Sequence, residues 1–521
     1  MPINFQKQKL FAVIGFIAYA MFLYVAARFL LAGLDGHASK TSACILTLAW
    51  IFLCASKRSF AIVLLLSCMA AVYCPVGYEY GPPDFQAISS LLATDAKESL
   101  EFLSFISAKS LLKALAIPIL LLLAYGIAQR TQLKPWRNKT LVLASILCLA
   151  VLLAPIQFFS LLQTSYQQVE KEKAKLESFA KDSAWTEVVY HGGAKDYVLV
   201  IGESVRRDYM GLYGYPVDNT PFLGEAPATV VKGLSAGGTY TIGSLRLMLT
   251  KADKTTWQPR YDLNIVDLAN AAGLQTYWIS NQGYLGKYDT PISAIGSKAK
   301  TKHFVNASGY ETARHSDRIL LDIMSNFLNG GGEIGMTPRL FVLHTLGSHP
   351  SACERIKEMQ DPYVVSEKKW SYVGCYISSI KYTDELLRDL YDLMRNYEKK
   401  HHRPFSILYF ADHGMVHRDI DGVIYLNNNK ASKRHYDIPL AVIDSASTEH
   451  RMLHSAKSGL HFTDGLAAWM GISARELEPY DLFDGRNDAN DFGLKEKIRA
   501  IKGSDDPAVD ISAYLQETSV N

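Results

Sequence analysis

Residues with the chemistry of metal ligands follow two buried apolar runs of this chain. Glu203 comes directly after the run Tyr197–Ile201, which predicts a strand buried on both faces. Asp412 and His413 follow a second run, Ser406–Phe410. Because parallel strands end at one edge of a sheet, where ligands bind, these side chains are candidate metal ligands. Glu203 could instead cap the helix that follows it.

Hydroxyl and imidazole groups lie in two further segments. The run Leu340–His344 ends in an imidazole, and His349 follows five residues later. The Gly-rich segment 236–244 carries Thr239 and Thr241, although such a segment taken alone could be a surface turn. A threonine hydroxyl could complete a four-ligand Zn²⁺ site, where the metal would lower its pKa. The resulting nucleophile suits attack on phosphorus, with the histidines holding phosphoryl oxygens or protonating the leaving group.

The pattern around these groups predicts an α/β fold. Strand-like runs also occur at Thr276–Ile279 and Leu440–Ile443, with helical stretches between the strands at Val266–Ala272 and Tyr382–Tyr397. This alternation indicates a mostly parallel central sheet with helices on both faces.

The N-terminal part of the 521-residue chain is far more apolar than its 49% hydrophobic composition and net charge of +3 suggest. Five apolar segments are expected to form transmembrane helices: Phe11–Leu34, Cys44–Ala55, Phe60–Val76, Leu111–Ala128 and Leu141–Leu162. The second is long enough only if all of residues 41–56 insert. The first is too long for a cleaved signal peptide.

The positive charges favour one orientation. Lysines and arginines precede the first segment and separate the second from the third and the fourth from the fifth, so the N-terminus is expected in the cytoplasm. Five crossings then place the rest of the chain outside, in the periplasm of a bacterium, anchored to the inner membrane. We expect a transmembrane domain at 1–165 with an amphipathic periplasmic loop at about 79–110. A linker helix at 166–190 and a catalytic domain at 191–521 follow.

The outer loop and the cysteines of the soluble part each allow two interpretations. Helix starts at Asp84 and near Thr94 predict amphipathic helices at the membrane surface, where Glu98 could bind a lipid headgroup or merely cap a helix. Cys353 and Cys375, the two cysteines of the soluble part, predict a disulfide in an oxidising compartment, or else two separate buried thiols.

The chain resembles the bacterial phosphoethanolamine transferases of the alkaline-phosphatase/sulfatase-like superfamily. The resemblance rests on the five apolar segments, the amphipathic loop and four ordered motifs: Gly202-Glu-Ser-Val-Arg-Arg-Asp208, Gly238-Thr-Tyr-Thr241, His344-Thr-Leu-Gly-Ser-His349 and Asp412-His-Gly414. It implies phosphatidylethanolamine as donor and release of diacylglycerol. It also implies a sulfatase-like catalytic domain and a covalent intermediate on a threonine.

The resemblance also implies roles for individual residues. Glu203, Thr241, Asp412 and His413 match the zinc ligands for one ion, with a second ion left open, and Thr241 matches the nucleophile. His344 and His349 match histidines of the phosphoethanolamine site, and Thr94 and Glu98 match loop positions near the donor headgroup. Asn427 stands where the family has a further substrate-site histidine, so His417 or His435 could replace that histidine, or its role is lost.

Other departures bear on the acceptor. The cysteines that flank the nucleophile turn in lipid A transferases are absent here, where Gly237 stands, and Ser90 replaces an expected asparagine. Three segments, 201–208, 280–289 and 347–353, look most like those of transferases acting on osmoregulated periplasmic glucans or lipopolysaccharide inner-core sugars. We therefore expect a glycan hydroxyl as acceptor. The alternatives are lipid A, phosphoglycerol transfer from phosphatidylglycerol, and a non-catalytic lipid- or glycan-binding scaffold. We expect a monomer that binds no nucleic acid.

Overall fold

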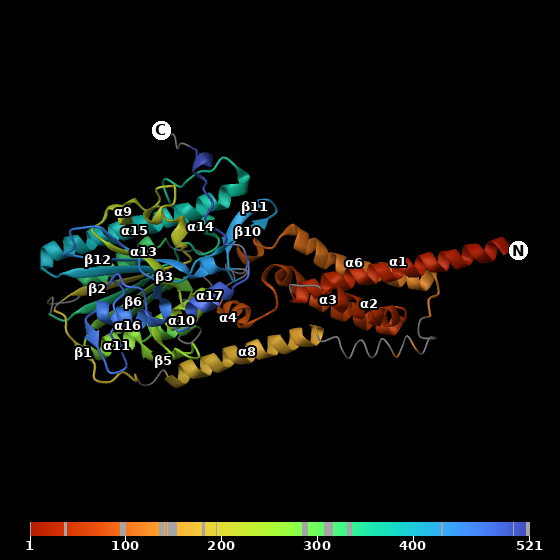
Figure 1. The fold of residues 1–521 in the computed structure, drawn as a ribbon, viewed down its shortest axis with the longest axis horizontal. Helices are drawn as coiled ribbons and strands as arrows, with labels where there is room; N and C mark the ends of the chain where they lie inside the picture. The colour runs from red at the N-terminus through yellow and green to blue at the C-terminus, as the bar shows by residue number, and fades with distance from the viewer. Residues whose placement is uncertain are drawn as a thin grey trace. The chain divides into compact units, whose positions relative to one another are not determined.

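The computed structural model describes residues 2–35, 39–93, 101–134, 140, 143, 154–179, 183–193, 195–283, 290–306, 316–330, 336–428, 431–503 and 505–516. The chain forms two compact units. The helical unit comprises Met1–Ser90 and Phe102–Val169, and the sheet unit comprises Leu91–Glu101 and Glu170–Asn521. Figure 1 shows the two units, which are described separately below.

The helical unit contains three helices long and apolar enough to cross a membrane. They lie in α1 (Pro2–Asp35), α3 (Lys57–Tyr80) and α6 (Ala108–Arg130), as the first, third and fourth apolar segments predict. The five predicted crossings are thus only partly confirmed. The second segment forms the 14-residue α2 (Lys40–Leu53). This helix rises about 21 Å, less than the roughly 30 Å of a hydrocarbon core. Most of the fifth segment lies outside the described residues.

Close helix packing in this unit depends on two glycines. A Cβ on Gly77 in α3 would lie 1.7 Å from the carbonyl oxygen of Gly33 in α1. Small residues at a membrane-helix contact let the backbones approach, which adds van der Waals contact where the hydrophobic effect is weak. The phenol of Tyr19, also in α1, donates to the Ile51 carbonyl oxygen at 2.8 Å and joins α1 to α2.

A short helix begins the outer loop where the sequence predicts it. Helix α4 (Phe85–Ala93) starts after Asp84, whose carboxylate accepts a hydrogen bond from the Ala87 amide at 2.9 Å. This side-chain acceptor satisfies one of the unpaired N–H groups of the first turn. Thr94 and Glu98, the predicted headgroup residues, lie outside the described residues.

A nine-stranded sheet forms the core of the sheet unit. Its main order is β13-β3-β12-β9-β2-β8-β6-β7, and β14 also pairs with β3. The strands are β2 (Asp196–Gly202), β3 (Thr229–Ser235), β6 (Gln275–Gly283), β7 (Thr301–Asn306), β8 (Arg339–His344), β9 (Phe405–Ala411), β12 (Asp437–Asp444), β13 (Arg451–Leu453) and β14 (Lys457–Ser458). Every residue of β2 and β9 is buried, as expected for central strands covered on both faces.

The sheet is mixed, which corrects part of the predicted topology. All five predicted strands exist, and β9, β2, β8, β6 and β7 pair in parallel. Strand β12, which contains the predicted run Leu440–Ile443, is antiparallel to both β9 and β3. A short apolar run carries no information on strand direction, because that depends on the path of the connecting chain.

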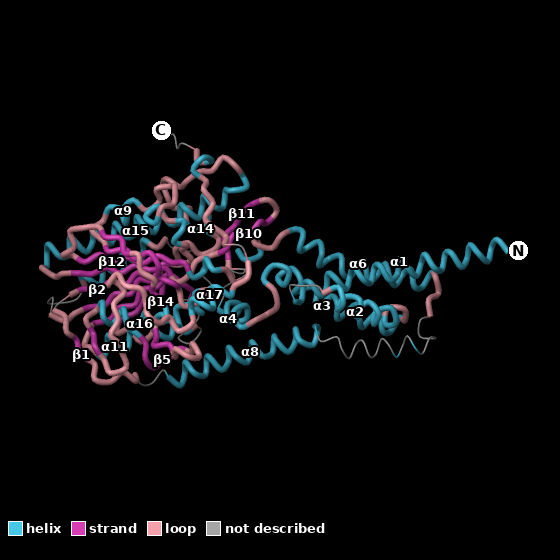
Figure 2. Tube along the Cα trace, viewed as in Figure 1, coloured by secondary structure: helices cyan, strands magenta, loops and turns pink. Residues whose placement is uncertain are grey.

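Helices cover both faces of this sheet. On one face lie α9 (Pro221–Glu225), α13 (Arg318–Asn329) and the long α15 (Ser371–His401), and on the other lie α10 (Thr241–Met248), α11 (Ile265–Ala271) and α16 (Phe462–Trp469). Helix α12 (Pro291–Gly296) packs against α10 and α11. Figure 2 shows these two helical layers with the strands between them. The smaller elements are the hairpins β4 (Thr250–Ala252)–β5 (Pro259–Asn264) and β10 (Val416–Ile420)–β11 (Val423–Asn427), the pair β1 (Val189–Tyr190)–β15 (Ile472–Ser473), and helices α14 (Ala352–Arg355) and α17 (Leu494–Ala500).

Of the described residues of the predicted linker helix, only 166–179 lie in a helix, α8 (Ala154–Phe179), which extends through the predicted boundary at residue 165. The predicted linker ends in a strand, because Val189–Tyr190 form β1. The last turns of α8 belong to the sheet unit. The buried Glu172 carboxylate accepts from Arg246 in α10 at 3.1 Å and from the Tyr261 hydroxyl. Leu176 packs with Tyr261 and Ala294 in a small apolar cluster.

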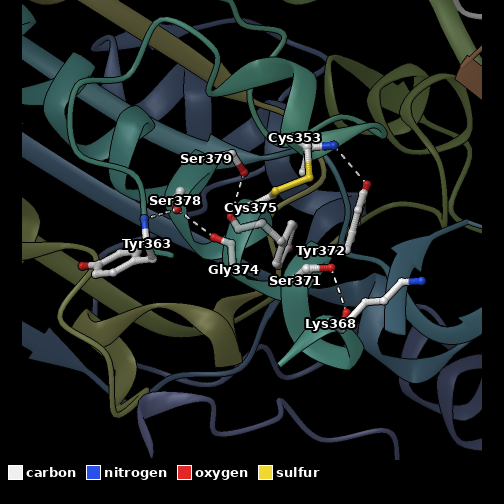
Figure 3. Close-up of a disulfide and its surroundings, with 11 residues drawn as sticks. Cys353, Tyr363, Lys368, Ser371, Tyr372, Gly374, Cys375, Ser378 and Ser379 are labelled. Carbon is white, nitrogen blue, oxygen red and sulfur yellow. Dashed lines mark hydrogen bonds between the residues drawn. A yellow bond between two sulfur atoms is a disulfide. The ribbon is translucent and has the colours of Figure 1, made fainter. Parts of the chain in front are cut away.

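A disulfide joins α14 to the second turn of α15. Cys353 and Cys375 are bonded, and the Ala352 amide donates to the Tyr372 hydroxyl at 3.0 Å beside the bond. Figure 3 shows the disulfide and Tyr372 against the start of α15. The bond holds the segment that follows His349 to the longest helix of the unit.

Replacing both Cys353 and Cys375 with serine is expected to lower the free energy of unfolding of the sheet unit. The bridge spans 22 residues, and closing a loop of that size stabilises a fold by about 3 kcal/mol through the entropy of the unfolded chain. Urea unfolding of detergent-solubilised protein, followed by tryptophan fluorescence, measures the change. Cys44→Ser, which replaces an exposed free cysteine, is the control. An unchanged midpoint in the double variant contradicts the expectation.

Candidate active site

The register of β2 against β9 places three candidate metal ligands together. Gly202 pairs with Ala411 at the ends of these parallel strands, so Glu203 and Asp412 both occupy the first position beyond the sheet. The carboxylate oxygens of Glu203 and Asp412 and a ring nitrogen of His413 lie within 4.8 Å of one another. All three side chains are at most 1% exposed.

Thr241 completes this cluster from a third element. As the first residue of α10, it brings its Oγ1 to 3.1 Å from Glu203 Oε2 and 3.3 Å from His413 Nε2. Ser244 anchors the turn, since its hydroxyl donates to the Asp412 carbonyl oxygen at 2.6 Å. A Cβ on Gly238 would lie 2.7 Å from the Gly243 carbonyl carbon, so only glycine permits this close turn.

The hydrogen bonds around the cluster leave its lone pairs facing inward. Asp412 Oδ1 accepts from the amides of Ser204 and His413, whereas Oδ2 has no hydrogen-bond partner among the described residues. His413 Nδ1 lies 2.7 Å from the Gly414 carbonyl oxygen, which can only accept, so Nδ1 carries the proton. His413 Nε2 then faces Glu203 Oε1 at 3.5 Å and Asp412 Oδ2 at 3.3 Å. Converging oxygen and nitrogen lone pairs, one of them otherwise unsatisfied, fit a divalent cation such as Zn²⁺.

Charge and burial shift the ionisation of these three groups. Burial raises the pKa of Asp412, and the neighbouring charge of Glu203 raises it further. Burial opposes ionisation of Glu203. However, Glu203 forms a hydrogen bond with His413 and is attracted by its charge, and together these keep the pKa of Glu203 below the ordinary range. Burial disfavours the imidazolium of His413, yet the carboxylates of Asp412 and Glu203 raise its pKa to about 9. In the metal-free cluster a proton on His413 therefore supplies the positive charge.

The two histidines of the third motif lie on the neighbouring strand and its following turn. His344 ends β8 opposite Ile201 of β2 and is 3% exposed, and burial lowers its pKa to about 4. Its Nδ1 lies 3.4 Å from Ser280 Oγ, and its Nε2 lacks a hydrogen-bond partner in the described part of the chain. The Nδ1 of His349 lies 2.6 Å from the Pro350 carbonyl oxygen. Because its pKa is about 4, the His344 ring is neutral at pH 7.

A carboxylate that the sequence analysis did not single out holds this turn. Asp317, before α13, accepts hydrogen bonds at 2.8 Å from the amides of Leu346 and Gly347 and from the Asn281 side chain. The next residue along β6, Gln282, donates to the Thr345 carbonyl oxygen at 2.7 Å and lies 3.4 Å from Glu203 Oε2. Asp317 carries no local sequence signal, whereas Asn281 and Gln282 follow a predicted strand that ends at the same sheet edge.

The possible replacements for the family histidine have different surroundings. His417 in β10 lies 2.8 Å from Asp506 and 2.5 Å from the Tyr209 hydroxyl. His435 is 1% exposed, and its ring centre is 6.5 Å from that of His413. Its Nδ1 accepts from the Ser432 amide at 3.0 Å, so Nε2 carries the proton. Asn427 is buried at the end of β11, paired in register with Val416.

The first motif also anchors the C-terminal segment. Arg206 is fully buried and donates to both carboxylate oxygens of Asp208, at 2.9 and 2.7 Å. It also binds the Asp506 carboxylate at 3.1 Å and the carbonyl oxygen of the same residue at 2.6 Å. The Ala508 amide donates to Asp208 at 2.9 Å. The arginine and aspartate of this motif therefore hold residues 506–508 behind the Glu203 turn.

Comparisons with known proteins identify relatives of this chain. Residues 195–472 match the sulfatase family, and residues 41–178 match the family described as phosphoethanolamine transferase EptA/EptB. A putative phosphoethanolamine transferase of Haemophilus influenzae is 38% identical over 83% of this chain and 89% of its own length. Phosphoethanolamine transferase OpgE of Escherichia coli is 31% identical over 79% of this chain and 80% of its own length.

A solved structure shows the same fold over most of the chain. The integral membrane lipooligosaccharide phosphoethanolamine transferase A of Neisseria meningitidis aligns with a TM-score of 0.59 at 17% identity, covering 89% of this chain and 97% of that one. The fold and the four-residue cluster define a sulfatase-like membrane enzyme. The chain belongs to the phosphoethanolamine transferase family, which confirms the resemblance seen in the sequence.

His413→Asn is expected to abolish zinc binding, whereas His461→Asn leaves it intact. The second three-residue cluster of the described chain, His461, Asp464 and Glu478, is a matched comparison. There the Lys251 ammonium already lies 2.7 and 2.9 Å from the two Asp464 oxygens, so the site holds its own cation. Metal content of the purified variants after zinc loading and dialysis measures the difference. Loss of zinc from His461→Asn alone would place the metal at the other cluster.

Zinc affinity is expected to rise with pH up to about pH 9. The pKa of His413 in the metal-free protein is about 9, so the ring is protonated at pH 7 and must release that proton to bind a metal. Below that pKa, the zinc affinity rises about tenfold per pH unit for each proton that is released on binding. Competition with a chelator at several pH values gives the slope, and titration calorimetry in two buffers counts the protons. A pH-independent affinity would contradict this charge assignment.

Proposed function

We propose that this protein transfers phosphoethanolamine from phosphatidylethanolamine to a glycan hydroxyl in the bacterial periplasm. The observation that carries the proposal is the position of the Thr241 hydroxyl, 3.1 Å from Glu203 and 3.3 Å from His413. A sulfatase would instead need a cysteine or serine that can become formylglycine in the nucleophile turn. Membership of the transferase family supports the reaction class.

The proposed reaction proceeds by two displacements at phosphorus. Thr241 Oγ1 forms a bond to phosphorus while the bond to the diacylglycerol oxygen breaks, and the hydroxyl proton passes to the departing diacylglycerol. An acceptor oxygen then forms its bond to phosphorus while the bond to Thr241 breaks, and the acceptor proton returns to the threonine. A zinc ion held by Glu203, Asp412, His413 and Thr241 would lower the pKa of the threonine hydroxyl.

Other side chains have proposed roles in binding the phosphoethanolamine group. The rings of His344 and His349 hold phosphoryl oxygens or carry a proton, and the neutral state of His344 at pH 7 suits either task. Asn427 stands in the place of the family histidine, and His417 or His435 takes over the role of that histidine. The protonated Nε2 of His435 can donate a hydrogen bond. Thr94 and Glu98 contact the donor headgroup.

The proposed location is the inner membrane, with the sheet unit in the periplasm. Three helices that can span a membrane support membrane insertion, and five crossings remain the proposed count. The Cys353–Cys375 bond supports an oxidising compartment for the sheet unit. The acceptor is proposed to be an osmoregulated periplasmic glucan or an inner-core sugar of lipopolysaccharide, because the cysteines flanking the nucleophile turn in lipid A transferases are absent. We propose that the protein acts as a monomer.

Thr241→Ala is expected to abolish formation of a covalent phosphoethanolamine adduct. The purified protein is incubated with phosphatidylethanolamine and analysed by intact mass and peptide mass spectrometry, with zinc-depleted protein beside it. Thr239→Ala changes the other threonine of the same turn and is the matched control, which retains the adduct. Adduct on wild-type protein and on Thr239→Ala, but not on Thr241→Ala, supports donor and nucleophile together.

The other outcomes identify the alternatives. An adduct formed only from phosphatidylglycerol indicates a phosphoglycerol transferase, and bound zinc without any adduct indicates another donor. Neither zinc nor adduct favours the non-catalytic scaffold. Adding glucan, lipopolysaccharide core or lipid A to the preformed adduct then identifies the acceptor, because only the true acceptor releases the group from Thr241 and gains its mass.

A further inference from the structure

The turn that carries His349 is fixed at its start by bonds to Asp317, Glu203 and Ser379. Asp317 accepts from the amides of Leu346 and Gly347, and the Ser348 amide donates to the Glu203 carbonyl oxygen at 3.0 Å. The Ser348 hydroxyl also accepts from Ser379 of α15 at 2.8 Å. The His349 amide donates to the Leu346 carbonyl oxygen at 3.1 Å. These bonds fix the backbone of the turn, and the direction of the imidazole depends on further contacts.

The imidazole of His349 is oriented through the carbonyl oxygen of Pro350. Because that oxygen can only accept, the 2.6 Å contact with Nδ1 assigns the proton to Nδ1 and leaves Nε2 as the acceptor of the neutral ring. Arg355 in α14 holds the same carbonyl oxygen with Nη2 at 3.1 Å. Its Nε also donates to the His349 carbonyl oxygen at 3.2 Å. One guanidinium thus fixes both peptide groups that set the direction of the ring.

The charge of this guanidinium is balanced by a residue of the outer loop. Arg355 Nη2 lies 2.7 Å from Glu101 Oε2, and the two side chains are only 4% and 12% exposed. A buried guanidinium needs a counter-charge, and removing one partner of a buried pair is strongly destabilising. Glu101 is 254 residues from Arg355 in the chain but only three residues after Glu98. Both residues of the pair belong to the sheet unit.

We propose that Arg355 is a positioning residue that couples the outer loop at Glu101 to the orientation of His349. The proposal rests on the proposed function, in which the loop binds the donor headgroup and His349 binds the phosphoryl group. Formation of the Glu101–Arg355 pair aligns His349 with the lipid donor that the loop holds. An ammonium cannot replace the guanidinium, because Arg355 uses a planar fork to reach two carbonyl oxygens and a carboxylate together.

Two substitutions test this coupling from opposite ends. Glu101→Gln removes the counter-charge at similar size, and Arg355→Lys keeps the charge but cannot span all three acceptors. Each is expected to slow adduct formation on Thr241 by roughly ten- to hundredfold, the effect of a small misplacement of a reacting group, with zinc content unchanged. The double variant is expected to be no slower than the slower single variant. Fully additive effects would overturn the coupling.

Arg395→Lys is the matched control. Arg395 also joins a backbone carbonyl oxygen, that of Ser445 at 2.7 Å, to a glutamate, Glu398 at 2.8 Å, but it lies in α15 and has no role in the proposed site. Its adduct rate is expected to equal that of wild type. If Arg395→Lys slows the reaction as much as Arg355→Lys does, the effect is general destabilisation and the proposal fails.

A measurement without substrate separates this proposal from the proposed function. Amide hydrogen exchange, read by mass spectrometry, is expected to become faster in the 346–355 peptide of Glu101→Gln but not of Arg395→Lys. Unchanged exchange in Glu101→Gln overturns the coupling, even if wild-type protein forms the adduct. Faster exchange in a protein that forms no adduct with any phospholipid supports the coupling and refutes the transferase reaction alone.

Discussion

The site is dominated by the cost of keeping two carboxylates out of water. Glu203 and Asp412 are almost completely buried, and their charges repel each other unless a positive charge lies between them. The fold supplies one such charge by placing His413 against both. A divalent cation would supply a larger one, at the point where Asp412 Oδ2 and His413 Nε2 converge. The same requirement explains why Thr241, a neutral hydroxyl, is the fourth member: a third anion there would make the metal-free fold unstable.

A second buried charge network lies directly behind the first and is balanced separately. Arg206 is enclosed by the carboxylates of Asp208 and Asp506, and this arrangement anchors the backbone that follows Ser204. Ser204 itself has a positive φ of 59°, a conformation that non-glycine residues rarely adopt. The surrounding bonds maintain it, because its amide donates to Asp412 and its carbonyl oxygen accepts from Tyr376. The buried Glu203 carboxylate and the buried Arg206 guanidinium therefore depend on one turn.

Sequence patterns predicted the strand ends better than the contacts made across the sheet. Glu203 and Asp412 each follow a buried apolar run and His344 ends one, and a parallel sheet brings such positions together whatever the lengths of the connections. The direction of β12 was not predictable, because its apolar run reads the same in either direction. Asp317 and Asp506 could not be identified either, because each lies far along the chain from the turn it holds. Local periodicity contains no information about such long-range partners.

The same reasoning accounts for the second apolar segment, which was predicted to cross the membrane but forms only the short helix α2. Apolar composition alone makes the second segment resemble a spanning helix, yet the helix ends at Leu53, before the turn at Cys54–Ser56. Ser59 donates to the Leu53 carbonyl oxygen at 2.6 Å, so a side chain of the next helix satisfies one of the carbonyl groups left open there. Hydropathy detects apolar residues but not the hydrogen bonds that end a helix. Where a polar side chain can satisfy the last turn, a helix ends earlier than its composition suggests.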